Sequence, residues 1–230
     1  MWNRSQLKTA AKGDLKGFYW LSFAVCLVAG ILTGGGLGLN LGSDSLDFGT
    51  VGEVGDIASS AISPALMTVF GGALLFASVF GWAFWAFVTN PVLVGKCRFF
   101  LHINEGEREI GTLFSAFKNG YTSVVKTMFM MNLFVFLWSL LFIIPGIIKS
   151  YSYRMVPYIL SENPALEYKD ALRASAEMTS GQKFKMFVLD LSFIGWCLLG
   201  VMAFGVGVLF VLPYIEATWA QLYLTMRQRA

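Results

Sequence analysis

Long apolar runs are the sequence feature that most constrains how this chain folds. They occupy residues 18–39, 61–95, 127–148 and 186–226. About 20 apolar residues in a helix cross the hydrocarbon core of a bilayer, so each run is long enough to span a membrane. Charged residues make up only 13% of the chain, against roughly 25% in an ordinary soluble domain. The sequence therefore predicts an integral membrane protein and argues against a secreted enzyme or a nucleic-acid-binding protein.

Two features divide the later runs into separate spans. Gly200, Gly205 and Gly207 interrupt the last run, which we divide into helices at about 185–203 and 205–226. The third run ends at the turn dipeptide Pro145-Gly146, and residues 147–160 after it are again mostly apolar. We expect those residues to form a fourth span that returns to the starting side.

The run at 61–95 is about twice the length that one crossing needs. It fits a long tilted helix that is kinked near Pro91. Alternatively, residues 57–77 form a separate interfacial or re-entrant segment. With either interpretation the chain crosses the membrane about six times.

The basic residues lie on one side of these six spans. Four of the Lys and Arg residues fall in 1–17, five in 95–126, four in 161–185 and two in the tail, which makes fifteen of seventeen. The long opposite loop, residues 40–60, is acidic. A four-span arrangement would place six basic residues on the opposite side. The positive-inside rule therefore predicts six spans with both termini in the cytoplasm.

Three segments of the chain resemble one another. They are LKTAAKGDLKGFYWLSF from Leu7, LFSAFKNGYTSVVKTMF from Leu113 and LRASAEMTSGQKFKMF from Leu172. Each combines an amphipathic stretch, a glycine and an apolar span, and each return span contains a proline, namely Pro91, Pro157 or Pro213. We therefore expect an all-α membrane bundle of three parallel repeats, each an amphipathic helix plus a transmembrane hairpin. It forms one domain over 1–230, with repeat units at about 1–105, 106–162 and 163–230.

The amphipathic stretches have two interpretations. The first carries a basic stripe at i, i+4 spacing, made of Arg4, Lys8, Lys12 and Lys16. Such helices lie in the membrane interface and contact anionic lipid headgroups, or they form a docking surface for a cytoplasmic partner. In the third stretch we expect Asn163 as N-cap, Pro164 at the first helical position and an end before Gly181.

Five polar residues fall inside the predicted spans: Asn132, Lys149, Arg154, Asp190 and Glu216. A charged residue at the centre of a bilayer costs about 2.5–3.5 kcal/mol on insertion scales, so these side chains should face the interior and pair. Their depths allow Arg154 to pair with Glu216 or with Asp190, whereas Lys149 lies nearer the outer face. The cluster either ties the repeats together or lines a polar cavity open to the cytoplasm. The helix-break prolines slightly favour a cavity.

The sequence offers little for catalysis or metal binding. Cys26, Cys97 and Cys197 are widely spaced, and His102 is the single histidine. These numbers argue against a disulfide framework, a zinc site and a Ser-His-Asp triad. We therefore expect no metal, no cofactor and no enzymatic activity.

Most of the chain resembles a known family, and the resemblance is strongest from about residue 90 onward. The resemblance rests on IPGIIKSYSYRMVPYILSENP (144–164), ALRASAEMTSGQKFKMFVLDLSFIGW (171–196) and GVGVLFVLPYIEATWAQLYL (205–224). These runs resemble a bacterial family of integral membrane proteins of unknown function. More distantly, they are similar to the membrane-spanning domain of bacterial glycerophosphodiester phosphodiesterases. The resemblance implies a six-span protein of the bacterial cytoplasmic membrane, and no catalytic residue carries over because the catalytic domain of those enzymes is separate and soluble.

Two functions fit these features. The first is a small transport or export-accessory component with a polar cavity inside the membrane. The alternative is a non-catalytic membrane scaffold that binds partners through its interfacial amphipathic helices. Candidate partners are anionic lipid headgroups, another membrane or cytoplasmic protein, and a second copy of the chain. The sequence identifies no substrate.

Overall fold

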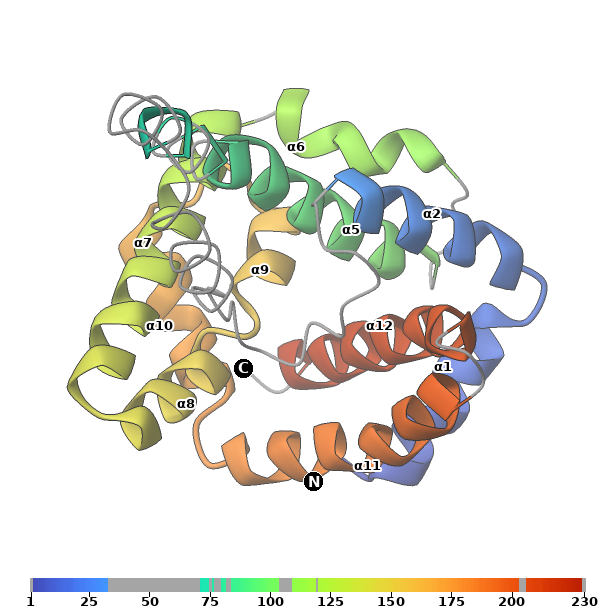
Figure 1. Ribbon diagram of the computed structural model, residues 1–230. Helices are drawn as coiled ribbons and strands as arrows, with labels where there is room; N and C mark the ends of the chain where they lie inside the picture. Colours follow the sequence, from blue (N-terminus) through green and yellow to red (C-terminus); the bar gives the residue numbers. More distant parts are fainter. Residues whose placement is uncertain are drawn as a thin grey trace, which may run out of the picture.

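The computed structural model describes residues 2–32, 71–74, 76, 80–81, 84–103, 109–118, 120–202 and 206–228. All regular elements in these ranges are helical, which confirms the predicted all-α class for this part of the chain (Figure 1). The elements are α1 (Arg4–Leu15), α2 (Tyr19–Leu32), the π-helical turn η1 (Trp85–Thr89), α5 (Asn90–Ile103), the 3₁₀ turn η2 (Ile110–Phe114), α6 (Ser115–Lys118), α7 (Tyr121–Leu141), α8 (Ile143–Ser152), α9 (Val156–Glu162), α10 (Tyr168–Met178), α11 (Lys183–Met202) and α12 (Val206–Arg227).

Helix α12 lies at the centre of the bundle, with α1, α2, α5 and α11 packed around it (Figure 1). Its residues Trp219, Ala220 and Leu222 belong to the main hydrophobic core. A smaller core forms between α5, α7, α9 and α10, where Val124 and Leu160 are fully buried. The sequence-distant first and last helices therefore share one core.

Two of the described helices, α7 and α11, are long and apolar enough to cross a membrane. A third candidate is the pair α1 and α2, which passes the same test together but is bent by 97°. Large apolar side chains are exposed on the α7–α8 hairpin, as is expected where lipid rather than water covers a helix. These helices agree with the predicted membrane protein, while the number of six spans stays a prediction.

A left-handed glycine follows each of the three amphipathic stretches. Gly17 (φ 96°), Gly120 (φ 66°) and Gly181 (φ 68°) separate α1 from α2, α6 from α7 and α10 from α11. A residue with a Cβ is strained at such positive φ, so glycine allows the chain to turn sharply there. Each of the three segments that resemble one another in sequence thus contains a left-handed glycine, and we call its surroundings the elbow.

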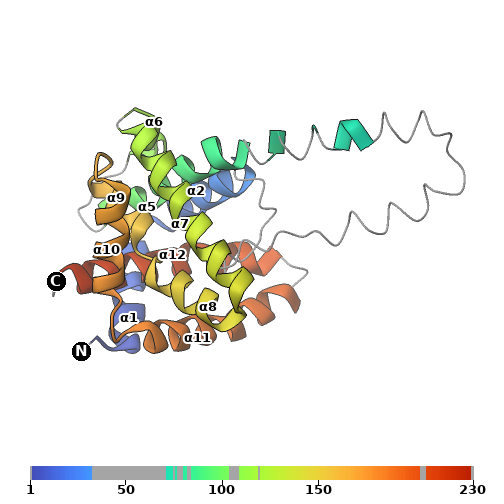
Figure 2. The ribbon, with the colours of Figure 1, turned by 90° about the vertical axis from the view of Figure 1, so that its left-hand side faces the viewer.

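The predicted fourth span is wrong as a continuous helix. Helix α8 ends at Ser152 and α9 begins at Val156, so residues 147–160 contain a break. Pro145 is also not in a turn, because the chain reverses between α7 and α8 at the extended residue Phe142 (Figure 2) and the proline lies in the first turn of α8. Proline is tolerated there because an N–H in the first turn has no helical acceptor.

The three return-span prolines occupy different positions. Pro91 is the second residue of α5, just after η1, and Pro157 lies in the first turn of α9. Only Pro213 among them lies inside a long helix, α12. The prediction that Asn163 caps the third amphipathic helix is wrong, because Asn163 ends α9 and Glu167 precedes α10.

Other predicted boundaries are confirmed. Helix α10 ends at Met178, before Gly181. Helices α11 and α12 are separate and lie on either side of residues 203–205, as expected from the glycine cluster. The predicted acidic loop at 40–60 lies outside the described residues. The same holds for residues 57–70 of the alternative segment predicted at 57–77.

Gly95 provides a test of the packing between α5 and η2. A Cβ at this position would lie 1.8 Å from the carbonyl oxygen of Leu113. Backbone atoms cannot move aside as a flexible side chain can, so we expect Gly95→Ala to destabilise the fold by at least about 1–3 kcal/mol. The melting temperature of the purified full chain in detergent measures the effect.

Gly13→Ala is the matched control. Gly13 lies in α1 with nothing within 4 Å of its added Cβ. Alanine is the better helix former by about 0.5–1 kcal/mol, so the melting temperature should stay the same or rise. Equal melting temperatures for Gly95→Ala and the wild type would contradict the close approach of α5 to η2.

Candidate functional site

The apolar face of α1 packs against the protein. Leu7, Ala11 and Leu15 are buried, as the predicted amphipathic pattern requires, and α12 is the principal neighbour of α1. At the other end of the bundle, α10 buries Ala171 and Leu172 against α7 and α9. These two amphipathic helices therefore use their apolar faces for the bundle and direct their charged faces outward.

The basic stripe of α1 divides into one half-buried and three exposed residues. Arg4, Lys12 and Lys16 are exposed, whereas Lys8 donates a hydrogen bond of 2.8 Å to the Ser192 hydroxyl of α11. Burial, followed by the charges of Arg4 and Lys12, lowers the pKa of Lys8. Lys8 thus belongs to the packing between α1 and α11.

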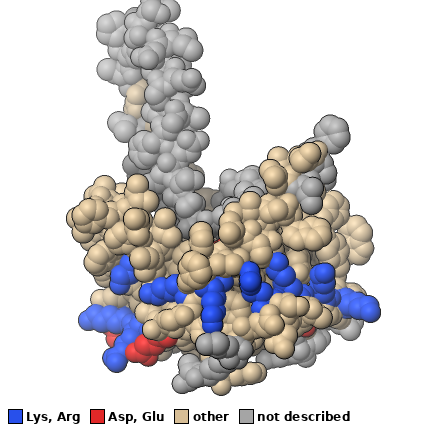
Figure 3. Space-filling model, turned by 90° about the horizontal axis from the view of Figure 1, so that it is seen from below, with Lys and Arg blue, Asp and Glu red and all other residues tan. Residues whose placement is uncertain are grey.

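Basic side chains gather in one band across the face of the molecule that contains α11 (Figure 3). In this view, the described residues above the band are neither basic nor acidic (Figure 3). A single band of this kind resembles the headgroup level of a membrane protein more than the scattered charges of a soluble domain.

Arg154, Asp190 and two aromatic residues form one polar cluster in the interior. Arg154 Nη2 lies 3.9 Å from Asp190 Oδ1, so of the two partners expected for Arg154 the structure brings Asp190 beside it. The Tyr151 hydroxyl donates to Asp190 Oδ2 at 2.9 Å. The Arg154 guanidinium also lies 4.3 Å from the centre of the Trp219 ring, within cation–π range. The cluster joins the α8–α9 break to α11 and α12.

Glu216 has a partner that the sequence analysis did not identify. Lys96 Nζ lies 2.6 Å from Glu216 Oε1, and the two side chains are only 12% and 18% exposed. The sequence predicts that the apolar run ends at residue 95, whereas α5 continues to Ile103 and contains Lys96. The sequence does contain a signal for this longer helix, because most residues between Lys96 and Ile103 are apolar.

The other predicted polar residues lie apart from these pairs. Lys149 Nζ lies 5.4 Å from the centre of the Trp138 ring and 5.6 Å from that of Tyr153. Asn132 is half-buried on α7, which packs mainly against α8, α10 and α5. Of the five residues expected in one cluster, Arg154 and Asp190 therefore lie together, Glu216 pairs with Lys96 instead, and the remaining two lie apart.

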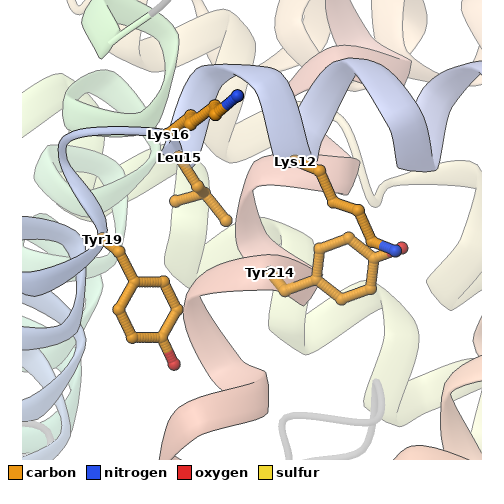
Figure 4. A pocket seen from close by; sticks show the side chains of 5 residues that line it. All are labelled: Lys12, Leu15, Lys16, Tyr19 and Tyr214. Carbon is orange, nitrogen blue, oxygen red and sulfur yellow. The ribbon is translucent and has the colours of Figure 1, made fainter.

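Two open pockets lie on the surface, and neither is lined by a residue of the interior ion pairs. The first has a volume of about 340 Å³ and lies at the α1–α2 elbow, where it is lined by Lys12, Leu15, Lys16, Tyr19 and Tyr214 (Figure 4). The second is apolar and is lined by Phe134, Leu137, Trp138, Leu140 and Leu141 of α7. Among the described residues, no group of three or more His, Cys, Asp and Glu side chains is arranged to hold a metal ion.

Comparison with known sequences finds a family match for the second half of the chain. Residues 110–230 match the family described as protein of unknown function, DUF975. The chain belongs to this family. The matched part of this DUF975 protein includes Arg154, Asp190 and Glu216, whereas Lys96 and the α1–α2 elbow precede it. No curated protein and no solved structure matches the chain, so the similarity to the phosphodiesterase membrane domain stays a prediction.

The Lys96–Glu216 pair of this DUF975 protein should contribute strongly to stability. Lys96→Met leaves a carboxylate without its partner in the interior, and we expect a loss of about 3 kcal/mol, the lower end of the range for broken buried pairs. The double variant Lys96→Met/Glu216→Leu removes both charges and should recover most of the loss. Thermal unfolding in detergent measures both.

The Arg173–Glu177 pair is the control, because its two side chains are 80% and 66% exposed. Arg173→Met should change stability by less than about 1 kcal/mol, as is usual for exposed pairs. If Lys96→Met were as harmless as Arg173→Met, the Lys96–Glu216 pair would not stabilise the bundle.

Proposed function

We propose that the chain is a multi-pass protein of the bacterial cytoplasmic membrane with both termini in the cytoplasm. The apolar helices α7 and α11, the exposed apolar α7–α8 hairpin and the band of basic residues support this proposal. The shared elbows at Gly17, Gly120 and Gly181 support an organisation in three parallel repeats with about six spans.

Within that membrane, we propose that the protein acts as a non-catalytic scaffold that binds a cytoplasmic partner. The observation that carries this proposal is the orientation of the amphipathic helices, which bury their apolar faces in the bundle and expose their charged faces. Helix α10 exposes Lys169, Asp170, Arg173 and Glu177, a surface of mixed charge. Charges of both signs give specificity to a contact with another protein and are not typical of a lipid-binding surface.

The interior charges fit a structural role in this proposal. Lys96 pairs with Glu216, and Arg154 contacts Asp190 and Trp219. Charges that are already satisfied by neighbouring helices have less capacity to bind a solute. Their pairing favours the scaffold over a protein whose polar core takes up a substrate.

A transport or export-accessory role is the second candidate. The contact between Arg154 and Asp190 lies beside the break between α8 and α9, and Tyr151 donates to the same carboxylate. Helix breaks beside intramembrane charges often line substrate pathways. This geometry supports the second candidate.

Reversing the exposed charges of α10 tests the scaffold. In Lys169→Glu/Arg173→Glu the surface loses its mixed charge, and we expect the partner complex to dissociate while the melting temperature stays within a few degrees. Native mass spectrometry of the full chain, gently extracted from its own membrane, measures the complex.

Lys118→Glu is the control, because Lys118 is exposed at the end of α6 and lies outside α10. This variant should retain the complex. A wild-type protein that extracts as a bare monomer would count against a scaffold, as would a complex that survives reversal of the α10 charges.

Arg154→Gln separates the two candidate functions. With a structural role, the variant leaves Asp190 without its charged neighbour and lowers the amount of folded protein and its melting temperature. With a transport role, folding is retained and uptake or export is lost. We expect the first result, which size-exclusion chromatography and thermal unfolding of the detergent-solubilised chain measure. A fully folded Arg154→Gln variant with an impaired transport phenotype would favour transport instead.

A further inference from the structure

The first of the three elbows differs from the others in the charge at two corresponding positions. Lys12 and Lys16 precede Gly17 by five positions and one position. The corresponding residues are Ser115 and Asn119 before Gly120, and Ala176 and Ser180 before Gly181. The turn itself needs only the glycine, as the other two elbows show. Because the turn does not require Lys12 and Lys16, these two lysines are available for another role.

These lysines line the pocket of about 340 Å³ at the inside of the bend (Figure 4). This volume lies at the lower end of the range of about 300–1,000 Å³ that is usual for small-molecule sites. Lys12 reaches the pocket from α1, Lys16 from the residue that follows α1, Tyr19 from the first turn of α2 and Tyr214 from α12 (Figure 4). The α1–α2 elbow and the sequence-distant helix α12 thus bring two lysine and two tyrosine side chains to one pocket.

The tyrosines hold the walls of this pocket in place. The Tyr19 hydroxyl donates a hydrogen bond of 2.7 Å to the carbonyl oxygen of Phe210, in the turn of α12 that precedes Pro213. The rings of Tyr214 and Phe193 are packed edge to face with their centres 5.7 Å apart. Lys12 Nζ lies 5.7 Å from the centre of the Tyr214 ring. The pocket is thus anchored to α11 and α12 and does not depend on α1 alone.

The charge of the pocket is purely positive. None of the described residues that line it is acidic, and the nearby carboxylate of Asp14 accepts a hydrogen bond of 2.5 Å from the Gln221 amide. The two lysine ammonium groups repel each other, and an anion bound near both would offset this repulsion by attracting each of them. Lysine ammonium groups bind phosphate as strong point charges with three donors each.

The surroundings of the pocket favour an anion that carries apolar chains. Helix α2 begins in the pocket wall, and its residues Trp20 and Ile31 are 72% and 71% exposed. Trp20 contacts Phe23, which stacks on Phe210 at 5.2 Å. Exposed aromatic and aliphatic residues beside basic groups are typical of the headgroup level of a bilayer. A soluble phosphate would use the lysines but would leave this apolar face uncovered.

We propose that the α1–α2 elbow binds the phosphate of an anionic membrane lipid between Lys12 and Lys16, with the acyl chains along α2. The inference rests on the proposed insertion of the chain in a membrane and adds a specific lipid site to it. Lys8 is excluded from the site because it is already bound to Ser192.

The experiment uses the full chain in detergent, titrated with phosphatidylglycerol, phosphatidylcholine or inorganic phosphate and observed by native mass spectrometry. We expect stoichiometric binding of phosphatidylglycerol, and much weaker binding of phosphatidylcholine and inorganic phosphate. In Lys12→Gln/Lys16→Gln the affinity for phosphatidylglycerol should fall roughly ten- to thirtyfold, the loss expected for two basic residues at a headgroup.

The control Lys118→Gln/Lys126→Gln also removes two exposed positive charges, but it does so around the second elbow. It should bind phosphatidylglycerol as the wild type does. If both double variants lost the same affinity for phosphatidylglycerol, the loss would follow from net charge alone, and the proposed site would be overturned. Inorganic phosphate that binds as tightly as phosphatidylglycerol would overturn the lipid assignment.

Failure of the site and failure of the proposed function remain distinguishable. A chain that is soluble without detergent would overturn the membrane function itself. A detergent-dependent chain whose elbow variant still binds phosphatidylglycerol like the wild type would overturn the lipid site alone. The α10 variants leave α1 unchanged and therefore report on the partner independently.

Discussion

The burial of charge inside an apolar bundle is the constraint on which the rest of the structure depends. A Lys or Glu side chain in an apolar interior is tolerated only when another group neutralises it. Lys96 of α5 meets Glu216 of α12, and Arg154 at the α8–α9 break meets Asp190 of α11. Each contact connects the last two helices with an earlier part of the chain, so the pairing selects one arrangement of helices among the many that apolar packing alone would permit.

The amphipathic helices follow from the same arrangement. Because α12 is central, α1 finds an apolar surface within the protein and buries Leu7, Ala11 and Leu15 there instead of in lipid. The left-handed elbow at Gly17 then turns the chain by 97° into α2. The charged faces remain outside, where the basic surface of α1 suits lipid headgroups and the mixed charges of α10 suit a protein. The same packing thus leaves two differently charged helix surfaces exposed.

Part of the candidate site could be predicted from the sequence. A charge within an apolar run must face the interior and pair, which identified Arg154, Asp190 and Glu216 and proposed Asp190 as one partner of Arg154. The same reasoning missed Lys96, because a lysine at the end of an apolar run has the same local pattern whether its helix stops or continues. The sequence also provided no indication that the Lys149 ammonium lies beside the rings of Trp138 and Tyr153.

The sequence by itself determined the helical class, the apolar helices, the amphipathic faces and the three elbow glycines, because each depends on the local spacing of residues along the chain. Only the tertiary structure decided which charges meet, that α8 and α9 are separate helices, and that Tyr214 joins Lys12 and Lys16 in one pocket. These depend on contacts between residues as far apart as α1 and α12. Such contacts depend on the packing of the whole bundle, so the local spacing of residues does not predict them.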